Sequence, residues 1–213
     1  NKANLKELAR RFGTREIPDA DLVAWKGAPR VVPYSLGTVW LPGELKLMQF
    51  SLLPSWSKEK KVKFATHNAR LDGVDTKPTW RKVFRERRCV VPMTDFVEPI
   101  YTGDLAGNMV DFRVESGLLL AAGLWDRWVN PTDGEVVESF TIITDEPYDF
   151  VRKTGHDRSP LFLGEDIVPE WLDPNQHDAD RLKGILKKGR FIPKLMVDID
   201  RPLRPGWEKR RSK

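Results

Sequence analysis

The chain has 213 residues, of which 40% are hydrophobic and 31% are charged, a balance typical of an ordinary globular domain. No hydrophobic run approaches the roughly 20 residues that span a bilayer, and no basic-then-hydrophobic leader opens the sequence. We therefore expect neither a membrane protein nor a secreted one. A single cysteine, Cys89, excludes an internal disulfide, and with only three histidines we expect no metal centre.

The net charge of +5 is unevenly distributed along the chain. Between Lys58 and Arg88 there are eleven Lys or Arg and four Asp or Glu, so this stretch carries +7 and the rest sums to −2. Such an excess is typical of a surface that binds a polyanion, although a solvated helix face has the same composition. Eight tryptophans favour the first interpretation slightly, because exposed aromatic rings beside Lys and Arg stack on single-stranded bases.

The first predicted elements are two amphipathic helices. One begins near Asn4, where Asn4 and Glu7 would form a capping pair, and it stops at Gly13. Its apolar residues recur at helical spacing, namely Leu5, Leu8, Ala9 and Phe12. The second runs through Trp80, Val83 and Phe84, and Thr79 is its expected N-cap.

Most later elements are predicted to be strands. Residues 110–115 alternate with period two, as in a half-buried strand, and the short apolar runs 118–124 and 139–144 are typical of buried strands. A helix over 180–188 and a closing strand over 194–199 follow. Many short strands with scattered helices, without regular β-α-β alternation, predict an α+β fold.

The domain organisation is expected to be simple. The chain shows no internal repeat, no low-complexity segment and no composition shift that would mark a domain boundary. We expect one domain over residues 1–208, followed by a mobile basic tail over residues 209–213.

Three polar residues stand among hydrophobic or turn-forming neighbours. Asn68 precedes Ala-Arg, Glu98 follows the apolar run 89–92, and His156 precedes the apolar run 161–163. Taken singly, each has a structural explanation: a turn or cap residue, a strand-end ion-pair partner and a satisfied loop histidine. The sequence has no phosphate-binding glycine loop and no G-x-S-x-G nucleophile elbow.

Together and in this order, the segments around these residues resemble the SOS response-associated peptidase (SRAP) family. The matching segments are Asn68-Ala69-Arg70, Arg88-Cys89-Val90-Val91-Pro92 with Phe96 and Glu98, Gly123-Leu124-Trp125, Ser139 to Thr144, and His156-Asp157-Arg158 with Pro160. The resemblance implies a mixed α+β domain with a curved, barrel-like β core and peripheral helices. It also implies a DNA-repair protein that captures abasic sites in single-stranded DNA as a covalent crosslink, and that removes its own initiator methionine at the same site.

The chemistry that the resemblance implies starts from an N-terminal cysteine. Its α-amine, with an ordinary pKa near 8, would attack the aldehyde of an opened abasic sugar, and its thiol would then close a stable thiazolidine ring. By resemblance, Glu98 would move protons at the amine, His156 would assist opening of the sugar ring, and Asn68 would position the N-terminus. A carboxylate and an imidazole suit acid–base work, and an amide suits fixed hydrogen bonding.

The resemblance also implies the DNA-binding residues. Arg70 would bind a phosphate, Arg81 and Arg158 would contact DNA as well, and Pro33 and Trp56 would wedge or stack near the unpaired base. The expected partner is single-stranded DNA with abasic sites, and no metal or organic cofactor is expected. We expect a monomer in the cytoplasm, associated with the nucleoid if the source is bacterial.

Two departures from the family pattern bear on these expectations. The sequence starts Asn1-Lys2 where family members start Met-Cys followed by Gly or Asn, so the expected cysteine would immediately precede Asn1. Cys89 is a poor substitute, because it lies in an apolar strand and has no adjacent α-amine. Glu98 is followed by Pro99 where the family usually has Trp, which weakens one expected stacking contact.

Two alternatives therefore stay open. The same fold could recognise single-stranded DNA without covalent chemistry, or the protein could be a thiol peptidase that acts on other proteins. The second is disfavoured because no Cys/His pair is apparent beyond Cys89. The intact mass of the protein after incubation with an abasic oligonucleotide distinguishes covalent capture from both alternatives.

Overall fold

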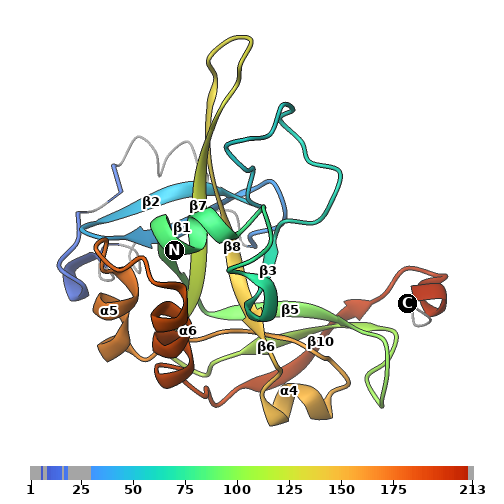
Figure 1. The fold of residues 1–213 in the computed structure, drawn as a ribbon. Helices are drawn as coiled ribbons and strands as arrows, with labels where there is room; N and C mark the ends of the chain where they lie inside the picture. The colour runs from blue at the N-terminus through green and yellow to red at the C-terminus, as the bar shows by residue number, and fades with distance from the viewer. Residues whose placement is uncertain (1–5, 7–8, 16, 19–29, 211–213) are drawn as a thin grey trace.

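A seven-stranded sheet forms the centre of the fold in a computed structural model, which describes residues 6, 9–15, 17–18 and 30–210 (Figure 1). Its strands are β1 (Leu36–Leu41), β2 (Glu44–Phe50), β3 (Asn68–Arg70), β4 (Arg88–Met93), β7 (Leu119–Val129), β8 (Val136–Asp145) and β9 (Ser159–Pro160). A three-stranded sheet has the order β10-β6-β5, with β5 (Asp95–Ile100), β6 (Asn108–Arg113) and β10 (Met196–Pro202). The two sheets carry the motifs that the sequence analysis singled out.

The helices are short. They comprise α3 (Arg81–Glu86), α4 (Asp149–Lys153), α5 (Val168–Leu172) and α6 (Ala179–Lys188), together with the 3-10 turns η1 (Leu71–Gly73), η2 (Glu165–Ile167) and η3 (Trp207–Arg210). In Figure 1, α5 and α6 lie together beside the large sheet, whereas α4 lies below the three-stranded sheet. In the described part of the chain, no helix has both the length and the hydropathy needed to cross a membrane.

Strand pairing in the large sheet closes on itself. β1 pairs with β2 and β4, β4 pairs with β7, and β7 pairs with β8, all antiparallel. β2 then pairs in parallel with β8, where Gln49 lies opposite Ser139 and Phe50 lies opposite Phe140. The hydrogen bonds therefore run around a ring. This ring confirms the expected α+β fold with a curved β core.

The ring has a hydrophobic core on each of its two faces, because side chains alternate between the faces of a strand. One face packs against α3, α5 and α6 through residues such as Phe84, Trp171 and Leu186. The other face packs against the three-stranded sheet, whose inward residues include Phe96, Ile100, Val110 and Phe112. The space between the two sheets is therefore the second core, and the candidate site lies at its edge.

β7 and β8 continue beyond the ring as a hairpin that projects from the body of the molecule (Figure 1). Near its tip, Glu135 accepts a hydrogen bond from Nζ of Lys60 at 2.6 Å. This ion pair joins the hairpin to the loop between β2 and β3, which carries part of the basic stretch.

Most of the elements predicted beyond residue 100 are confirmed. The predicted strands correspond to β6, β7, β8 and β10, with β7 and β8 longer than predicted because they form the projecting hairpin. The helix predicted over 180–188 is α6, whose N-cap residue Asp178 accepts a hydrogen bond from the backbone N–H of Arg181 at 2.8 Å. Of the predicted basic tail, the first two residues belong to η3 and residues 211–213 lie outside the described residues.

The prediction that Thr79 is the N-cap of the helix around Trp80 is wrong. Helix α3 begins at Arg81, and Trp80 occupies the N-cap position without a side-chain hydrogen bond. The backbone N–H groups of Trp80 and Arg81 donate to the carbonyl of Lys77 at 3.0 and 2.9 Å, so the preceding turn satisfies donors that a capping side chain would otherwise bind. Burial of the Trp80 ring, which is 6% exposed, holds that turn in place.

Part of the predicted opening helix is described. Ala9 is buried, and the ring of Phe12 stacks on Trp40 with centroids 4.0 Å apart. Gly13, the predicted stop, has a φ of +60°, the left-handed conformation in which helices commonly end at glycine. The predicted capping pair and the apolar positions Leu5 and Leu8 lie outside the described residues.

Candidate functional site

The side chains of Glu98 and His156 meet at the edge of the core between the sheets. Nε2 of His156 lies 3.4 Å from Oε2 of Glu98, and the two side chains are 12% and 21% exposed. Glu98 lies on β5 between Phe96 and Ile100, so these three side chains point to the same face of the strand. Two of the three predicted catalytic residues are therefore in contact, in a largely desolvated position.

The orientation of the His156 ring is set by its own loop. Nδ1 lies 2.8 Å from the carbonyl oxygen of Arg158 and 3.2 Å from its backbone nitrogen. With a proton on Nδ1, the ring donates to the carbonyl; without one, Nδ1 accepts the Arg158 N–H. In both tautomers the backbone occupies Nδ1, so Nε2 is the atom left to exchange a proton with Glu98 or a ligand.

Asn68 lies on β3, which pairs in parallel with β8 so that Asn68 is opposite Ile142 and Arg70 is opposite Thr144. Ala69 is fully buried in the core that faces the helices, so Asn68 points to the opposite face, toward the three-stranded sheet that carries Glu98. Among the described residues, no direct contact joins Asn68 to Glu98 or His156.

The Asn68 and His156 motifs nevertheless converge on one position of β8. Thr144 pairs with Arg70 on one side and with Pro160 on the other. Two strand spacings separate these residues, which places β3 roughly 10 Å from the strand that follows His156. The segments that carry Asn68 and His156 therefore lie near the same end of β8, and Glu98 joins them through its contact with His156.

Trp56, a predicted stacking residue, has an exposed ring on an anchored segment. The residue is 56% exposed. Before it, the N–H of Ser55 donates to Asp126 at 2.7 Å, and after it, the carbonyl of Ser57 accepts from Nε1 of Trp128 at 2.7 Å. An exposed indole between two buried anchors is well suited to stacking on a flat ligand, because little mobility is lost on binding.

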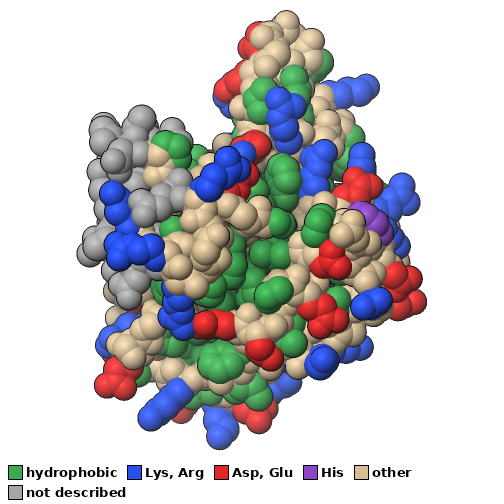
Figure 2. Space-filling view, turned by 90° about the vertical axis from the view of Figure 1, so that its left-hand side faces the viewer, with side chains coloured by type: hydrophobic (Ala, Val, Ile, Leu, Met, Phe, Trp, Pro, Cys, Tyr) green, Lys and Arg blue, Asp and Glu red, His purple; other side chains and the backbone are tan. Residues whose placement is uncertain are grey.

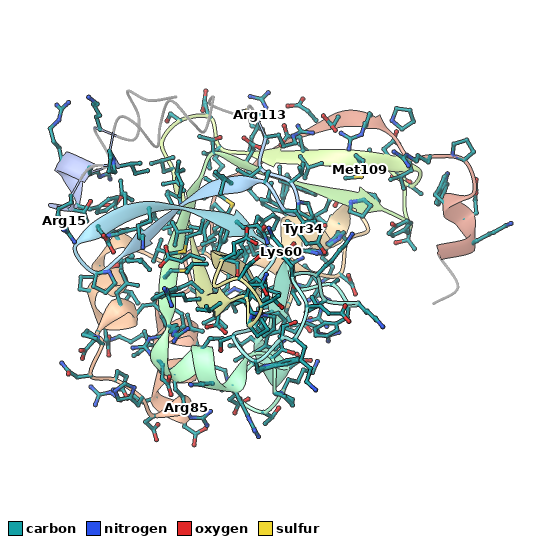
Figure 3. All side chains as sticks on the ribbon, turned by 90° about the horizontal axis from the view of Figure 1, so that it is seen from above. Arg15, Tyr34, Lys60, Arg85, Met109 and Arg113 are labelled. Atoms are coloured by element: carbon teal, nitrogen blue, oxygen red, sulfur yellow. The ribbon has the colours of Figure 1, made fainter. Side chains whose placement is uncertain are left out.

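Pro33 lies in an exposed turn beside a residue that the sequence analysis missed, Tyr34. Tyr34 has a φ of +72°, at a turn position where glycine is usual after proline, and the residue is 49% exposed. Nζ of Lys61 lies 5.4 Å from the ring centroid; Tyr34 and Lys60, the residue before Lys61, are both labelled in Figure 3. An aromatic residue after proline in a turn sequence is the only signal that could have indicated this position. A left-handed tyrosine costs energy, and such strain commonly marks a functional position.

The three predicted DNA-binding arginines differ in their surroundings. Arg81 is exposed at the start of α3. Arg70 is also exposed but pairs with Asp72 at 3.0 Å, and Arg158 has a guanidinium nitrogen 3.9 Å from the carboxylate of Glu146. A phosphate that bound Arg70 or Arg158 would therefore compete with a carboxylate of the same chain.

Not all of the basic stretch is available to a ligand. The guanidinium of Arg88 is buried, where burial lowers its pKa, and it donates to the carbonyls of Phe84, Trp171 and Asp173. Arg87 forms an ion pair with the buried Asp126. Lys60 and Arg70 are exposed but pair with Glu135 and Asp72. The other exposed cations of the stretch are Lys58, Lys61, Lys63, Lys77, Arg81 and Lys82.

One face of the molecule carries mixed charges. On the face shown in Figure 2, Lys and Arg side chains alternate with Asp and Glu around a hollowed hydrophobic area. That face therefore presents no single-sign patch.

Cys89 is completely buried in β4, and burial raises the pKa of its thiol well above the ordinary value. A buried, protonated thiol is a poor nucleophile. The carbonyl of the same residue accepts a hydrogen bond from Nε1 of Trp171 at 2.9 Å, so this strand is tied to α5. Within the described residues, no group of three or more His, Cys, Asp or Glu could hold a metal ion.

Comparison with known proteins relates the chain to a defined family. The family described as "SOS response associated peptidase (SRAP)" matches this chain over residues 4–194. The abasic site processing protein YoqW of Bacillus subtilis (strain 168) is 31% identical over 141 residues, which cover 66% of this chain and 62% of YoqW. The abasic site processing protein HMCES of Xenopus tropicalis is 31% identical over 152 residues, which cover 61% of this chain and 45% of HMCES. The chain thus spans less than two thirds of these relatives.

Solved structures share the fold. A Bacteroides thetaiotaomicron protein superimposes with a TM-score of 0.75 at 22% identity, over 96% of this chain and 90% of that chain. A Bordetella bronchiseptica protein superimposes with a TM-score of 0.63 at 22% identity, over 78% and 84% of the two chains. Since the family model matches residues 4–194, which is most of the sequence, this chain belongs to the SRAP family.

Proposed function

We propose that this protein captures abasic sites in single-stranded DNA through a cysteine placed immediately before Asn1, with Glu98 and His156 as the acid–base groups. The observation that carries the proposal is the 3.4 Å contact between these two side chains. The names of the relatives, abasic site processing proteins, support the substrate class.

The proposed reaction uses the two groups at different steps. His156 takes the proton from the anomeric hydroxyl of the closed sugar and returns one to the ring oxygen, which opens the sugar to an aldehyde. The cysteine amine then adds to the carbonyl carbon, and the carbonyl electron pair moves to oxygen. Glu98 carries two protons in turn from the amine nitrogen to that oxygen: the first converts the alkoxide to a hydroxyl, and the second lets it leave as water, so that an imine forms.

The thiol of the same cysteine completes the capture. Its sulfur adds to the imine carbon while its proton goes to the nitrogen, which closes a thiazolidine ring and leaves no reducible imine. Asn68 points to the face where this chemistry takes place and would hold the N-terminus by its amide. Removal of the initiator methionine exposes the amine, and we assign that step to the same carboxylate.

DNA would be bound by aromatic and basic side chains around this site. Trp56, Pro33 and Tyr34 offer exposed surfaces for stacking on unpaired bases. Arg70, Arg81 and Arg158, with exposed lysines such as Lys61, would contact phosphates. Proteins that bind single strands typically combine these two kinds of contact: aromatic rings stack on any base, and cations contact the phosphate backbone.

The proposal is tested with protein that carries Met-Cys before Asn1, incubated with an abasic single-stranded oligonucleotide and analysed by denaturing gel and intact mass. We expect an adduct that resists heat and weighs the sum of the methionine-free protein and the DNA less one water. The chain that begins with Asn1 should form only a reducible imine, or nothing. A heat-stable adduct of that chain without reductant would show that the thiazolidine account is wrong.

The second candidate function is non-covalent recognition of single-stranded DNA by the same surface. The exposed rings of Trp56 and Tyr34 favour it, since they require no nucleophile. It predicts salt-dependent binding of both abasic and intact strands, with no adduct even when the cysteine is present. The thiol peptidase alternative is disfavoured by the complete burial of Cys89.

A further inference from the structure

The loop that carries His156 makes an unusually close backbone contact at Gly155. This glycine has a φ of +92°, and a Cβ atom on it would lie 2.0 Å from the carbonyl oxygen of Thr102. Real Cβ contacts do not approach this distance, and the φ value is itself unfavourable for other residues. Any side chain at position 155 would therefore displace the loop away from Thr102.

Thr102 lies just after β5, the strand that carries Glu98. Its hydroxyl donates to the carbonyl oxygen of Gly155 at 3.0 Å. A Cβ on the neighbouring Gly103 would be only 3.8 Å from the carbonyl oxygen of Thr154, so the two loops are adjacent over more than one residue. The contact thus joins the segment after Glu98 to the residue before His156.

The three residues 156–158 are held at both ends. On one side, the backbone N–H of Gly155 donates to Arg152 at 3.0 Å, which closes the end of α4. On the other side, Ser159 and Pro160 pair with Asp145 and Thr144 of β8. Within the loop, Nδ1 of His156 contacts the backbone of Arg158. The position of the imidazole therefore depends on where these two ends are fixed.

We infer that Gly155 and Thr102 are positioning residues, whose close contact holds Nε2 of His156 against Glu98. β9 fixes His156 relative to the large sheet, and the Gly155–Thr102 contact fixes it relative to β5, in the small sheet. Without the Gly155–Thr102 contact, the imidazole would stay in its loop, but Nε2 would no longer be held opposite the Glu98 carboxylate. This inference rests on the proposed function for its kinetic consequence, because His156 is assigned to the opening of the sugar ring.

The test compares Gly155→Ala with Gly117→Ala, both in protein that carries Cys before Asn1. Gly117 has a similar φ of +86°, but a Cβ on it would meet nothing within 4 Å, so this control matches the backbone strain without the displaced contact. Crosslinking rates are measured with a natural abasic sugar and with an oligonucleotide aldehyde that cannot close. We expect Gly155→Ala to slow capture of the closed sugar by on the order of 10²-fold, since small misplacements of a catalytic group have effects of this size. Capture of the open aldehyde should change little, and Gly117→Ala should match the parent protein on both substrates.

Thr102 supplies a milder pair of variants should Gly155→Ala fold poorly. Thr102→Val removes the hydroxyl and should slow capture of the closed sugar a few-fold, while Thr102→Ser keeps the hydroxyl and should restore the rate. Equal slowing on the closed and open substrates would mean that the contact only maintains the fold. Rates of Gly155→Ala equal to those of Gly117→Ala would also overturn the inference.

A readout independent of DNA separates this inference from the proposed function. The ¹⁵N chemical shifts of the His156 ring report its tautomer and its hydrogen bonds. They should change in Gly155→Ala and Thr102→Val, and remain as in the parent protein in Gly117→Ala and Thr102→Ser. If no variant forms a crosslink, the proposed function fails while these spectra still decide the positioning role. Unchanged shifts in all four variants would exclude it.

Discussion

Nε2 of His156 and Oε2 of Glu98 lie 3.4 Å apart, although the two residues come from different elements, the loop after α4 and strand β5. The contact brings an imidazole nitrogen and a carboxylate oxygen together at one position. The proposed reaction nevertheless uses the two groups at different steps, which allows their roles to be separated.

The first prediction concerns these separate roles. Glu98→Gln keeps the size of the side chain but removes the titratable carboxylate, so it should slow capture of both closed and open aldehydes, and methionine removal as well. His156→Ala should slow capture of the closed sugar, with little effect on an aldehyde that is already open. Acid–base assistance is typically worth about 10²–10⁴-fold, so a time course of adduct formation resolves both losses.

The control for this experiment is folding, followed by circular dichroism and thermal unfolding of each variant. Because the two side chains touch, a purely structural role would lower the rate on both substrates in both variants to the same degree. That pattern would contradict the assignment of separate catalytic steps.

The second prediction concerns Arg70, whose guanidinium lies 3.0 Å from Asp72. Affinity for single-stranded DNA should fall with salt, with a log–log slope of roughly −0.7 per neutralised phosphate. Arg70→Ala should weaken binding and reduce the slope by up to one such contact, whereas Asp72→Asn should strengthen binding because it removes a competing carboxylate. Fluorescence anisotropy over a salt series measures both effects. Opposite changes in the two variants are required; a salt-independent affinity would place the basic stretch on an unused surface.

The third prediction concerns Ser51, a buried residue with a φ of +82°. The left-handed conformation costs a non-glycine residue roughly 1–2 kcal/mol, and glycine adopts it freely. We expect Ser51→Gly to raise the free energy of unfolding by about 1 kcal/mol in urea denaturation. Ser55→Gly, at a position where φ is not positive, is the control and should lower it slightly. A loss of stability in Ser51→Gly would mean that the serine side chain contributes more than the strain costs.

The fourth prediction concerns the ion pair between Asp75 and Lys183, whose atoms lie 2.6 Å apart. Hydrogen bonding to the Lys183 ammonium lowers the pKa of Asp75, so the folded state binds a proton less readily than the unfolded chain. The pair therefore stabilises the fold above the ordinary carboxyl pKa of about 3.9, and this contribution is lost as pH falls through the lowered value. Asp75→Asn should lower the free energy of unfolding by about 1 kcal/mol at neutral pH and by progressively less in acid.

Urea denaturation at neutral pH and at about pH 3 compares the parent protein with this variant. Glu135→Gln is the matched control, because its pair with Lys60 is more exposed and should contribute only a few tenths of a kcal/mol. A cost of Asp75→Asn that grew as pH fell would contradict the sign of the linkage.

Local patterns in the amino-acid sequence were sufficient for much of this molecule. The alternation that predicted β6 reflects Val110 and Phe112 facing the core, and the helical spacing that predicted α6 is capped by Asp178. Such features depend on neighbours a few residues apart, so they can be recognised without a structure. The order of the motifs was likewise sufficient to indicate the family.

The tertiary structure decided what those motifs do together. The contact between Glu98 and His156, the burial of Arg88 within the basic stretch and the approach of Gly155 to Thr102 all join segments distant in sequence. Tyr34 became visible as a candidate only through its left-handed φ and exposed ring. Composition and periodicity describe which residues are inside or outside, whereas the register of strands and the path of loops determine which atoms meet. That information depends on the packing of the whole chain.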